Sequence, residues 1–181
     1  HHIKRRKIMN EKTFLVDYFE QCKKFLDKTD IADTVIEAKK VILATKKGGG
    51  QLIFAGNGAS ASIANHASLD FTKQGKVRSV NFNESAFITA FSNDFGYENW
   101  IEKALGFYAA AGDTLILVSC SGTSPSVVNA AKYANLNGIN VITFTGFEED
   151  NPLKTAGDVN FWLDCRAYNI IEGIHQLWLL S

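Results

Sequence analysis

The fold of this chain is constrained most by an alternation of short apolar runs and helix-like patterns that starts after Gly50. Each run has the length of a buried strand, and the segments that follow carry apolar residues at three- and four-residue spacing. Because parallel strands need crossover helices, the alternation predicts a doubly wound, parallel five-stranded sheet, a three-layer αβα sandwich of the α/β class. We expect strands at residues 51–55, 77–82, 113–119, 139–146 and 158–164.

Helices are expected before the sheet and between its strands. Residues 10–27 form an amphipathic helix with an aromatic stripe, and a second helix runs from a cap at Asp30 to a glycine stop at Gly48. The stripe fits core packing within the chain as well as contact between copies. Further helices are expected at residues 60–73, 84–91, 100–109, 125–135 and 170–181, with a loop at residues 92–99.

The domain organisation is expected to be simple. The chain has 181 residues, enough for one sizeable core, and shows no internal repeat or linker. We therefore expect residues 9–181 to form a single domain. Residues 1–8 start with two histidines and continue with a basic run, so we interpret them as a purification-tag remnant or a disordered arm.

Charge, hydropathy and cysteine content limit the partners and the compartment that this chain is expected to have. The 19 Lys and Arg residues balance the 19 Asp and Glu residues, so neither nucleic acid nor an anionic membrane is expected as a partner. No apolar stretch is long enough to span a bilayer. The three cysteines are odd in number and widely spaced, which favours a reducing cytoplasm over a disulfide framework.

The segment with the clearest chemical meaning follows the third expected strand. Residues 119–124 read Ser-Cys-Ser-Gly-Thr-Ser and open the next helix. A helix N-terminus offers unpaired N–H groups and a partial positive charge, and the hydroxyl groups add neutral donors. One capping residue would explain a single hydroxyl but not a cluster of them. The segment therefore predicts a binding site for a phosphomonoester.

A second turn of this kind follows the first strand. Residues 56–60 read Gly-Asn-Gly-Ala-Ser and also open a helix. Ligands of doubly wound sheets bind beyond the carboxyl ends of the strands, where we expect both turns to lie. The first turn lacks the full spacing of a dinucleotide site, and residues 119–124 lack the lysine of a P-loop. No nucleotide cofactor is therefore expected.

His66 and Asp70 form a further pair of chemical interest on the helix after the first turn. They are four residues apart, so both side chains lie on one face of that helix. Such a pair can bind a divalent metal, act as an acid–base pair, or form only a local hydrogen bond beside the core. The spacing alone leaves these alternatives open.

Three motifs taken together resemble a known family. The Gly-Asn-Gly-x-Ser turn, the Asn-Asp-Phe-Gly-Tyr segment at residues 93–97 and the Ser-x-Ser-Gly-x-Ser loop are similar to those of SIS (sugar isomerase) proteins, and among them of phosphoheptose isomerases. The similarity covers residues 14–180. It implies the SIS fold, a homotetramer with active sites at subunit boundaries, and conversion of sedoheptulose 7-phosphate to D-glycero-D-manno-heptose 7-phosphate through an enediol. Such a product feeds lipopolysaccharide or capsule heptose synthesis.

The resemblance also implies which residues contact the substrate. The hydroxyl-rich loop holds the phosphate, with Cys120 at a position where threonine is usual. The Gly-Asn-Gly turn and the Asn-Asp pair contact the sugar. By this correspondence the substrate-binding residues are Asn57, Gly58, Ala59, Ser60, Asn93, Asp94, Ser119, Cys120, Ser121 and Ser124.

A catalytic role for His66, Asp70 and Glu172 is implied in the same way, with zinc as a candidate cofactor held by these three residues. Asp70 stands where the family has glutamate, and Glu172 where it has glutamine. The family's last-helix histidine corresponds to Leu180, which can neither bind a metal nor transfer a proton. An open zinc site with three protein ligands and a water remains one alternative. Metal-free chemistry, with Glu172 as base and His66 as acid, is the other.

The activity itself has two competing interpretations. Leu180 favours a non-catalytic SIS regulator that binds phosphosugars, whereas the retained His66 and the carboxylates at Asp70 and Glu172 favour an enzyme. A hexose or pentose phosphate isomerase, or an etherase, of the same fold is a third option. The match at residues 93–97 argues against that third group.

Overall fold

The computed structural model describes residues 10–27 and 31–181. The predicted tag remnant or arm at residues 1–8 and the predicted cap Asp30 lie outside the described residues. Among the helices that are described, none combines the length and the apolar character needed to cross a lipid bilayer.

A five-stranded sheet forms the centre of the molecule. Its strands are β1 at Leu52–Gly56, β2 at Ser79–Asn81, β3 at Thr114–Ser119, β4 at Asn140–Thr145 and β5 at Val159–Trp162. All neighbouring strands are parallel, in the order β2-β1-β3-β4-β5. This arrangement confirms the predicted doubly wound α/β fold.

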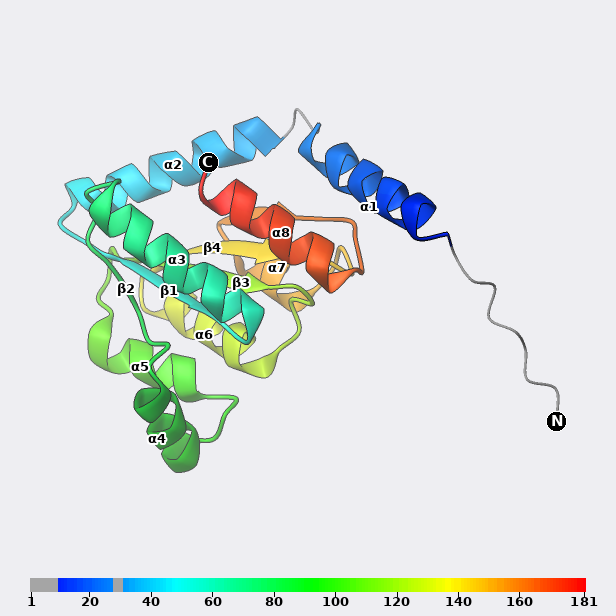
Figure 1. Cartoon of the computed structure of the whole chain (residues 1–181). Helices are drawn as coiled ribbons and strands as arrows, with labels where there is room; N and C mark the ends of the chain where they lie inside the picture. The colour runs from blue at the N-terminus through cyan, green and yellow to red at the C-terminus, as the bar shows by residue number, and fades with distance from the viewer. Residues whose placement is uncertain (1–9, 28–30) are drawn as a thin grey trace, which may run out of the picture.

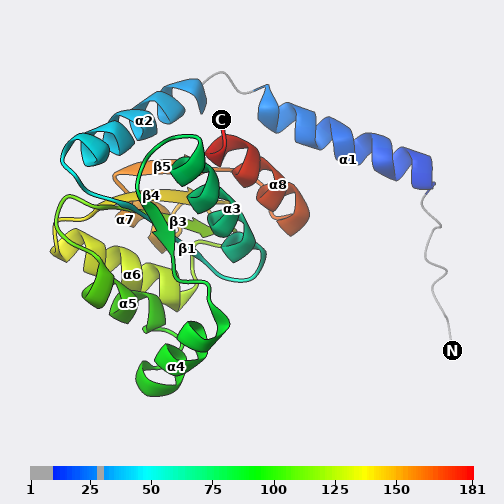
Figure 2. The ribbon, with the colours of Figure 1, turned by 60° about the vertical axis from the view of Figure 1, so that its left-hand side comes forward.

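The helices are α1 at Glu11–Leu26, α2 at Ile31–Lys47, α3 at Ala59–Lys73, α4 at Ser85–Phe95, α5 at Trp100–Tyr108, α6 at Pro125–Leu136, α7 at Pro152–Ala156 and α8 at Tyr168–Leu179. They cover both faces of the sheet, with α2, α3 and α8 on one face and α5 and α6 on the other (Figures 1 and 2). Successive strand residues point to opposite faces. Phe54 and Ile116 therefore join the core under α3 and α8, while Ile53 and Leu115 join the core under α5 and α6.

The strand register brings the chemically unusual turns together. Gly56 at the end of β1 lies opposite Val118, and Ser119 at the end of β3 lies opposite Thr145. The three central strands thus end at the same edge of the sheet. The turn before α3 and the loop before α6 consequently follow neighbouring strands, as the sequence predicted.

The structure corrects two expected segments. Residues 92–95, expected in a loop, continue α4 to Phe95, and the helix ends at Gly96 with a φ of 83°. Aromatic contacts at four-residue spacing favour the extra turn, because the rings of Phe87 and Phe91 stack and those of Phe91 and Phe95 meet edge to face. The short helix α7 was not expected, because five residues are too few to show a helical period.

The aromatic stripe of α1 is largely outside the core. Phe14 is 48% exposed and Phe19 is 63% exposed, whereas Phe25 is buried near the end of the helix. Figure 1 shows α1 extending away from the sheet. Tyr18 and Cys22 are partly buried against the same core as Phe25, so core packing within the chain explains one side of the stripe and leaves Phe14 and Phe19 unexplained.

His175 on α8 is a buried polar residue that the fold keeps neutral. Its side chain is 0% exposed and lies against the rings of Phe144 and Trp178. Nε2 lies 3.1 Å from the carbonyl oxygen of Thr145 and donates to it, while Nδ1 has no hydrogen-bond partner in the structure. Burial lowers the pKa of His175 from 6.5 to about 4, and the hydrogen bond to Thr145 offsets this only partly.

We expect the free energy of unfolding to fall in mild acid because of His175. A lowered pKa in the folded state means that the stabilisation is present above pH 6.5 and is lost as the pH falls towards 4. The loss from pH 7 to pH 4 is about 3 kcal/mol. Urea unfolding at both pH values measures it, with His175→Phe as the control that keeps a ring in place. Equal losses for the wild type and His175→Phe would contradict this account.

Candidate functional site

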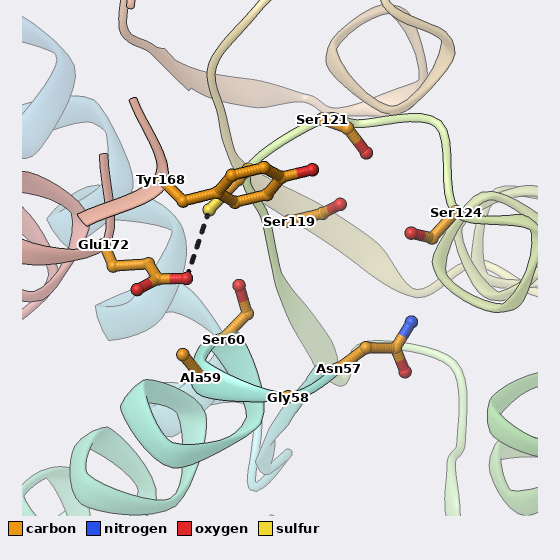
Figure 3. Close-up of a pocket in the computed structure, with 10 residues that line it drawn as sticks. Asn57, Gly58, Ala59, Ser60, Ser119, Ser121, Ser124, Tyr168 and Glu172 are labelled. Atoms are coloured by element: carbon orange, nitrogen blue, oxygen red, sulfur yellow. Dashed lines mark hydrogen bonds between the residues drawn. The ribbon is translucent and has the colours of Figure 1, made fainter. Parts of the chain in front are cut away.

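A pocket opens where the predicted phosphate-binding turns meet. Its volume is about 290 Å³. Figure 3 shows its lining side chains gathered from the turn before α3, the loop before α6 and the start of α8. The lining residues are Asn57, Gly58, Ala59, Ser60, Ser119, Cys120, Ser121, Ser124, Tyr168 and Glu172. Eight of the ten predicted substrate-binding residues are therefore in one place.

Three helices begin at this pocket without a side-chain cap. The N-cap residues are Gly58 for α3, Ser124 for α6 and Ala167 for α8, and none of them makes a side-chain hydrogen bond to its helix. By contrast, Asn10 caps α1 and Glu84 caps α4 with side-chain oxygens. The first N–H groups of the three helices lack an intrahelical partner and carry a partial positive charge. The pocket is consequently suited to an anion.

The loop before α6 holds its hydroxyl groups in a defined arrangement. The N–H of Gly122 donates to Oγ of Ser119 over 3.2 Å, and Oγ1 of Thr123 donates to Oγ of Ser121 over 3.0 Å. Gly122 has a φ of 64°, and a Cβ atom there would overlap the buried side chain of Asn151. A glycine is thus required at this point of the loop.

Among the described residues, no cationic side chain lines the pocket, and Glu172 is the one carboxylate that does. Oε1 of Glu172 lies 3.9 Å from Sγ of Cys120, which donates a weak hydrogen bond to it (Figure 3). Burial, together with the nearby charge of Glu172, raises the pKa of Cys120 to about 11. Cys120 is therefore a neutral thiol at physiological pH and is no nucleophile.

Asn57 is held by residues outside the pocket. Its Nδ2 donates to Oγ of Ser126 over 2.9 Å, and its Oδ1 accepts from the hydroxyl of Tyr97 over 3.0 Å. Tyr97 belongs to the segment after α4, so this contact ties that segment to the turn before α3. The contacts orient the Asn57 amide at the edge of the pocket.

His66 and Asp70 lie beyond the lining of the pocket. Nε2 of His66 is 3.2 Å from Oδ2 of Asp70, and Nδ1 is 3.3 Å from Nε2 of Gln176 on α8. A rise of 1.5 Å per residue places His66 about 9 Å along α3 from Ser60. The pair therefore sits farther along the α3–α8 contact, on the same side as Glu172, which lies one turn before Gln176.

Asn93 and Asp94 are the two predicted substrate contacts that the chain does not bring to the pocket. Both are exposed at the end of α4, where Nδ2 of Asn93 donates to Oδ1 of Asp94 over 3.0 Å. Figure 1 shows α4 projecting from the body of the molecule. Within this chain the pair stands apart from the ten lining residues.

The three predicted zinc ligands are not gathered into one cluster. Within residues 10–27 and 31–181, no three His, Cys, Asp or Glu side chains come close enough to hold a metal. Asp70 hydrogen-bonds to His66 and Gln74, and the carboxylate of Glu172 faces Cys120 instead. Leu180 lines a small cavity together with Asp70, and its apolar side chain offers no ligand atom there.

Sequence reasoning missed three residues of this region. Tyr168 lines the pocket, Tyr97 holds Asn57, and Gln176 contacts His66. Tyr97 belongs to the segment used for the family resemblance, which was a signal for it. Tyr168 and Gln176 carry no local signal, because their positions depend on how α8 packs against the rest of the fold.

The chain is similar in sequence and in fold to proteins that are already known. The SIS domain family matches residues 17–146. A phosphoheptose isomerase of Aliarcobacter butzleri (strain RM4018) is 29% identical over 170 residues, which cover 86% of this chain and 89% of that protein. One from Sodalis glossinidius (strain morsitans) is 30% identical over 169 residues, 86% of each chain. The solved phosphoheptose isomerase of Neisseria gonorrhoeae has the same fold, with a TM-score of 0.85 at 24% identity over 94% of this chain and 95% of that one.

Proposed function

Since the chain belongs to the phosphoheptose isomerase family of SIS domain proteins, we propose that it interconverts a ketose phosphate and an aldose phosphate. The substrate is sedoheptulose 7-phosphate and the product D-glycero-D-manno-heptose 7-phosphate. The observation that carries the proposal is the pocket at the strand ends, where hydroxyl groups and three uncapped helix N-termini converge.

The hydroxyl-rich loop anchors the phosphate of the substrate. Ser119, Ser121 and Ser124 supply hydroxyl donors, and the first turns of α3 and α6 supply backbone N–H groups. Neutral donors hold the phosphate without pairing with the carboxylate of Glu172, as a cationic side chain would. Anchoring one end of the sugar removes most of its freedom before the reaction begins.

The reaction moves a proton between two neighbouring carbons. A base removes the proton from the carbon that bears a hydroxyl, an enediol forms, and the proton returns to the adjacent carbon. Glu172 is the proposed base, because its side chain is the carboxylate that lines the pocket. His66 is the proposed acid for the sugar oxygen. Its two ring nitrogens contact Asp70 and Gln176, so His66 exchanges one of these contacts for the sugar oxygen when the open chain extends along α3.

The proposed chemistry proceeds without zinc, in keeping with the donor arrangement. Prolonged dialysis against a chelator is expected to leave the kcat and the melting temperature unchanged, because His66 and Asp70 already satisfy each other by hydrogen bonds. Protein lacking His1 and His2 is used, so that these histidines bind no metal. Stoichiometric zinc in elemental analysis, with activity lost on chelation and restored by zinc, would contradict the prediction.

The biological setting is proposed from the same relationship. Three free cysteines favour the cytoplasm, where sugar phosphates are found. A homotetramer is proposed because the exposed rings of Phe14, Phe19 and Phe107 offer apolar surface to other copies. The product then supplies heptose for lipopolysaccharide or capsule.

Incubation with sedoheptulose 7-phosphate tests the proposal, with the aldose phosphate followed by ¹³C NMR. The account predicts an equilibrium mixture of ketose and aldose. Ribulose 5-phosphate and fructose 6-phosphate serve as comparison substrates and are expected to react at least 10-fold more slowly, because each extra contact discriminates by about that factor.

A non-catalytic phosphosugar-binding regulator is the second candidate. Leu180 at the end of α8, beside Asp70, favours it. Binding of sedoheptulose 7-phosphate with a rise in melting temperature, but without any aldose, would support the regulator over the enzyme.

A further inference from the structure

Tyr168 occupies a place in the pocket that the resemblance does not assign. It is the first residue of α8 and lines the pocket together with the hydroxyl-rich loop. Figure 3 shows its ring lying across the pocket, with the hydroxyl directed toward Ser119 and Ser121. The side chain is 57% exposed, and its hydroxyl makes no hydrogen bond to any residue in the described ranges.

The ring of Tyr168 packs against an aromatic ring in the loop after β4. The rings of Phe147 and Tyr168 meet edge to face, with centroids 5.1 Å apart at an angle of 70°. Phe147 itself has a φ of 54°, a conformation that non-glycine residues seldom adopt. The fold thus keeps a strained residue whose ring supports Tyr168.

Two further contacts connect the two loops that carry these rings. The N–H of Phe147 donates to the carbonyl oxygen of Cys165 over 2.9 Å. Glu148 and Arg166, the residues next to them, form an ion pair. The loop before α8 is therefore tied to the loop after β4 on the side of the pocket opposite α6, which positions the backbone that carries Tyr168.

The chemistry of a phenol suits this position. A phosphomonoester held at Ser121 and Ser124 presents several oxygens and accepts more hydrogen bonds than the serines supply. A tyrosine hydroxyl donates to such an anion without adding a positive charge. A lysine at this place would instead pair with the nearby carboxylate of Glu172.

We propose that the hydroxyl of Tyr168 donates a hydrogen bond to the phosphoryl group of the bound sugar phosphate, which makes Tyr168 a substrate-binding residue. This inference rests on the proposed function, because it requires the phosphate to lie at residues 119–124. Tyr168 closes the open side of the anion site, opposite the start of α6.

The test compares Tyr168→Phe with the wild type, since phenylalanine keeps the ring on Phe147 and removes only the hydroxyl. Losing one hydrogen bond to a charged group is expected to raise KM about 10-fold or more, with kcat changed less than twofold. The dissociation constant of inorganic phosphate, measured by calorimetry, rises by the same factor. Tyr108→Phe is the matched control, because Tyr108 is 55% exposed and lies outside this pocket.

Each outcome has one meaning. Unchanged KM and unchanged phosphate affinity in Tyr168→Phe would overturn the inference, as would a fall in kcat at constant KM. A rise in KM with unchanged affinity for inorganic phosphate would also overturn it, because the hydroxyl would then contact the sugar. If the wild type binds phosphate but does not isomerise, the proposed function fails, while the phosphate titration still decides the role of Tyr168.

Discussion

Replacing Glu172 by glutamine is expected to lower kcat by about 10²–10⁴-fold while KM changes by less than about threefold, the range that a general base supplies. The amide keeps the size of the side chain and its contact with Cys120, so the pocket retains its shape. It cannot accept a proton at neutral pH. The family resemblance places glutamine at this position in phosphoheptose isomerases. This variant therefore also tests whether the carboxylate of this chain acts as the base.

Two further variants make the result specific. Glu172→Asp keeps the charge but withdraws it by one methylene, so an intermediate kcat is expected. Glu102→Gln removes a carboxylate from the surface of α5, where it pairs with Lys103, and should leave both constants unchanged. If Glu172→Gln retains kcat within threefold of the wild type, the proton is carried by another group and the assignment of the base is wrong.

The second large effect is expected from the double variant Ser121→Ala/Ser124→Ala. Each hydroxyl that binds a charged ligand contributes about 1.5–3 kcal/mol, so losing two weakens phosphate binding by about 10²–10⁴-fold. Ser124 makes no side-chain hydrogen bond that caps α6, so its loss should hardly affect folding. Calorimetric titration with inorganic phosphate measures the dissociation constant directly.

A matched control separates binding from stability. Ser85→Ala/Thr89→Ala removes two hydroxyl groups from α4, which projects away from the pocket (Figure 1). The melting temperatures of both double variants should remain close to that of the wild type. Full phosphate affinity in Ser121→Ala/Ser124→Ala would show that the anion binds elsewhere.

The parts of the site that follow strands were predictable from local sequence. The strand at residues 113–119 and the polar residues 119–124 stand next to each other in the chain, and the fold class places every such loop at one edge of the sheet. The glycine at position 122 is likewise a local signal, since the loop requires a positive φ there. Eight of the predicted substrate contacts came together for these reasons.

The rest of the site depends on how the helices pack against one another, which local sequence patterns do not specify. His66 meets Gln176 across 110 residues of sequence, and Tyr168 reaches the pocket because α8 begins there, with its ring against Phe147. His66 and Asp70 lie together as expected, but the α8 side chain that contacts His66 is Gln176, and Glu172 faces Cys120 instead. Periodicity assigns side chains to faces of one helix and leaves the facing residues of its neighbour undetermined.

The most direct test of isomerisation is proton exchange in deuterated water. Sedoheptulose 7-phosphate is incubated with the full chain, and deuterium at the carbons next to the carbonyl is followed by ¹H NMR. The enediol mechanism predicts deuterium in both the ketose and the aldose, with incorporation lost in Glu172→Gln. Saturable binding of the sugar phosphate with no deuterium incorporated would contradict it and leave the protein as a binding module.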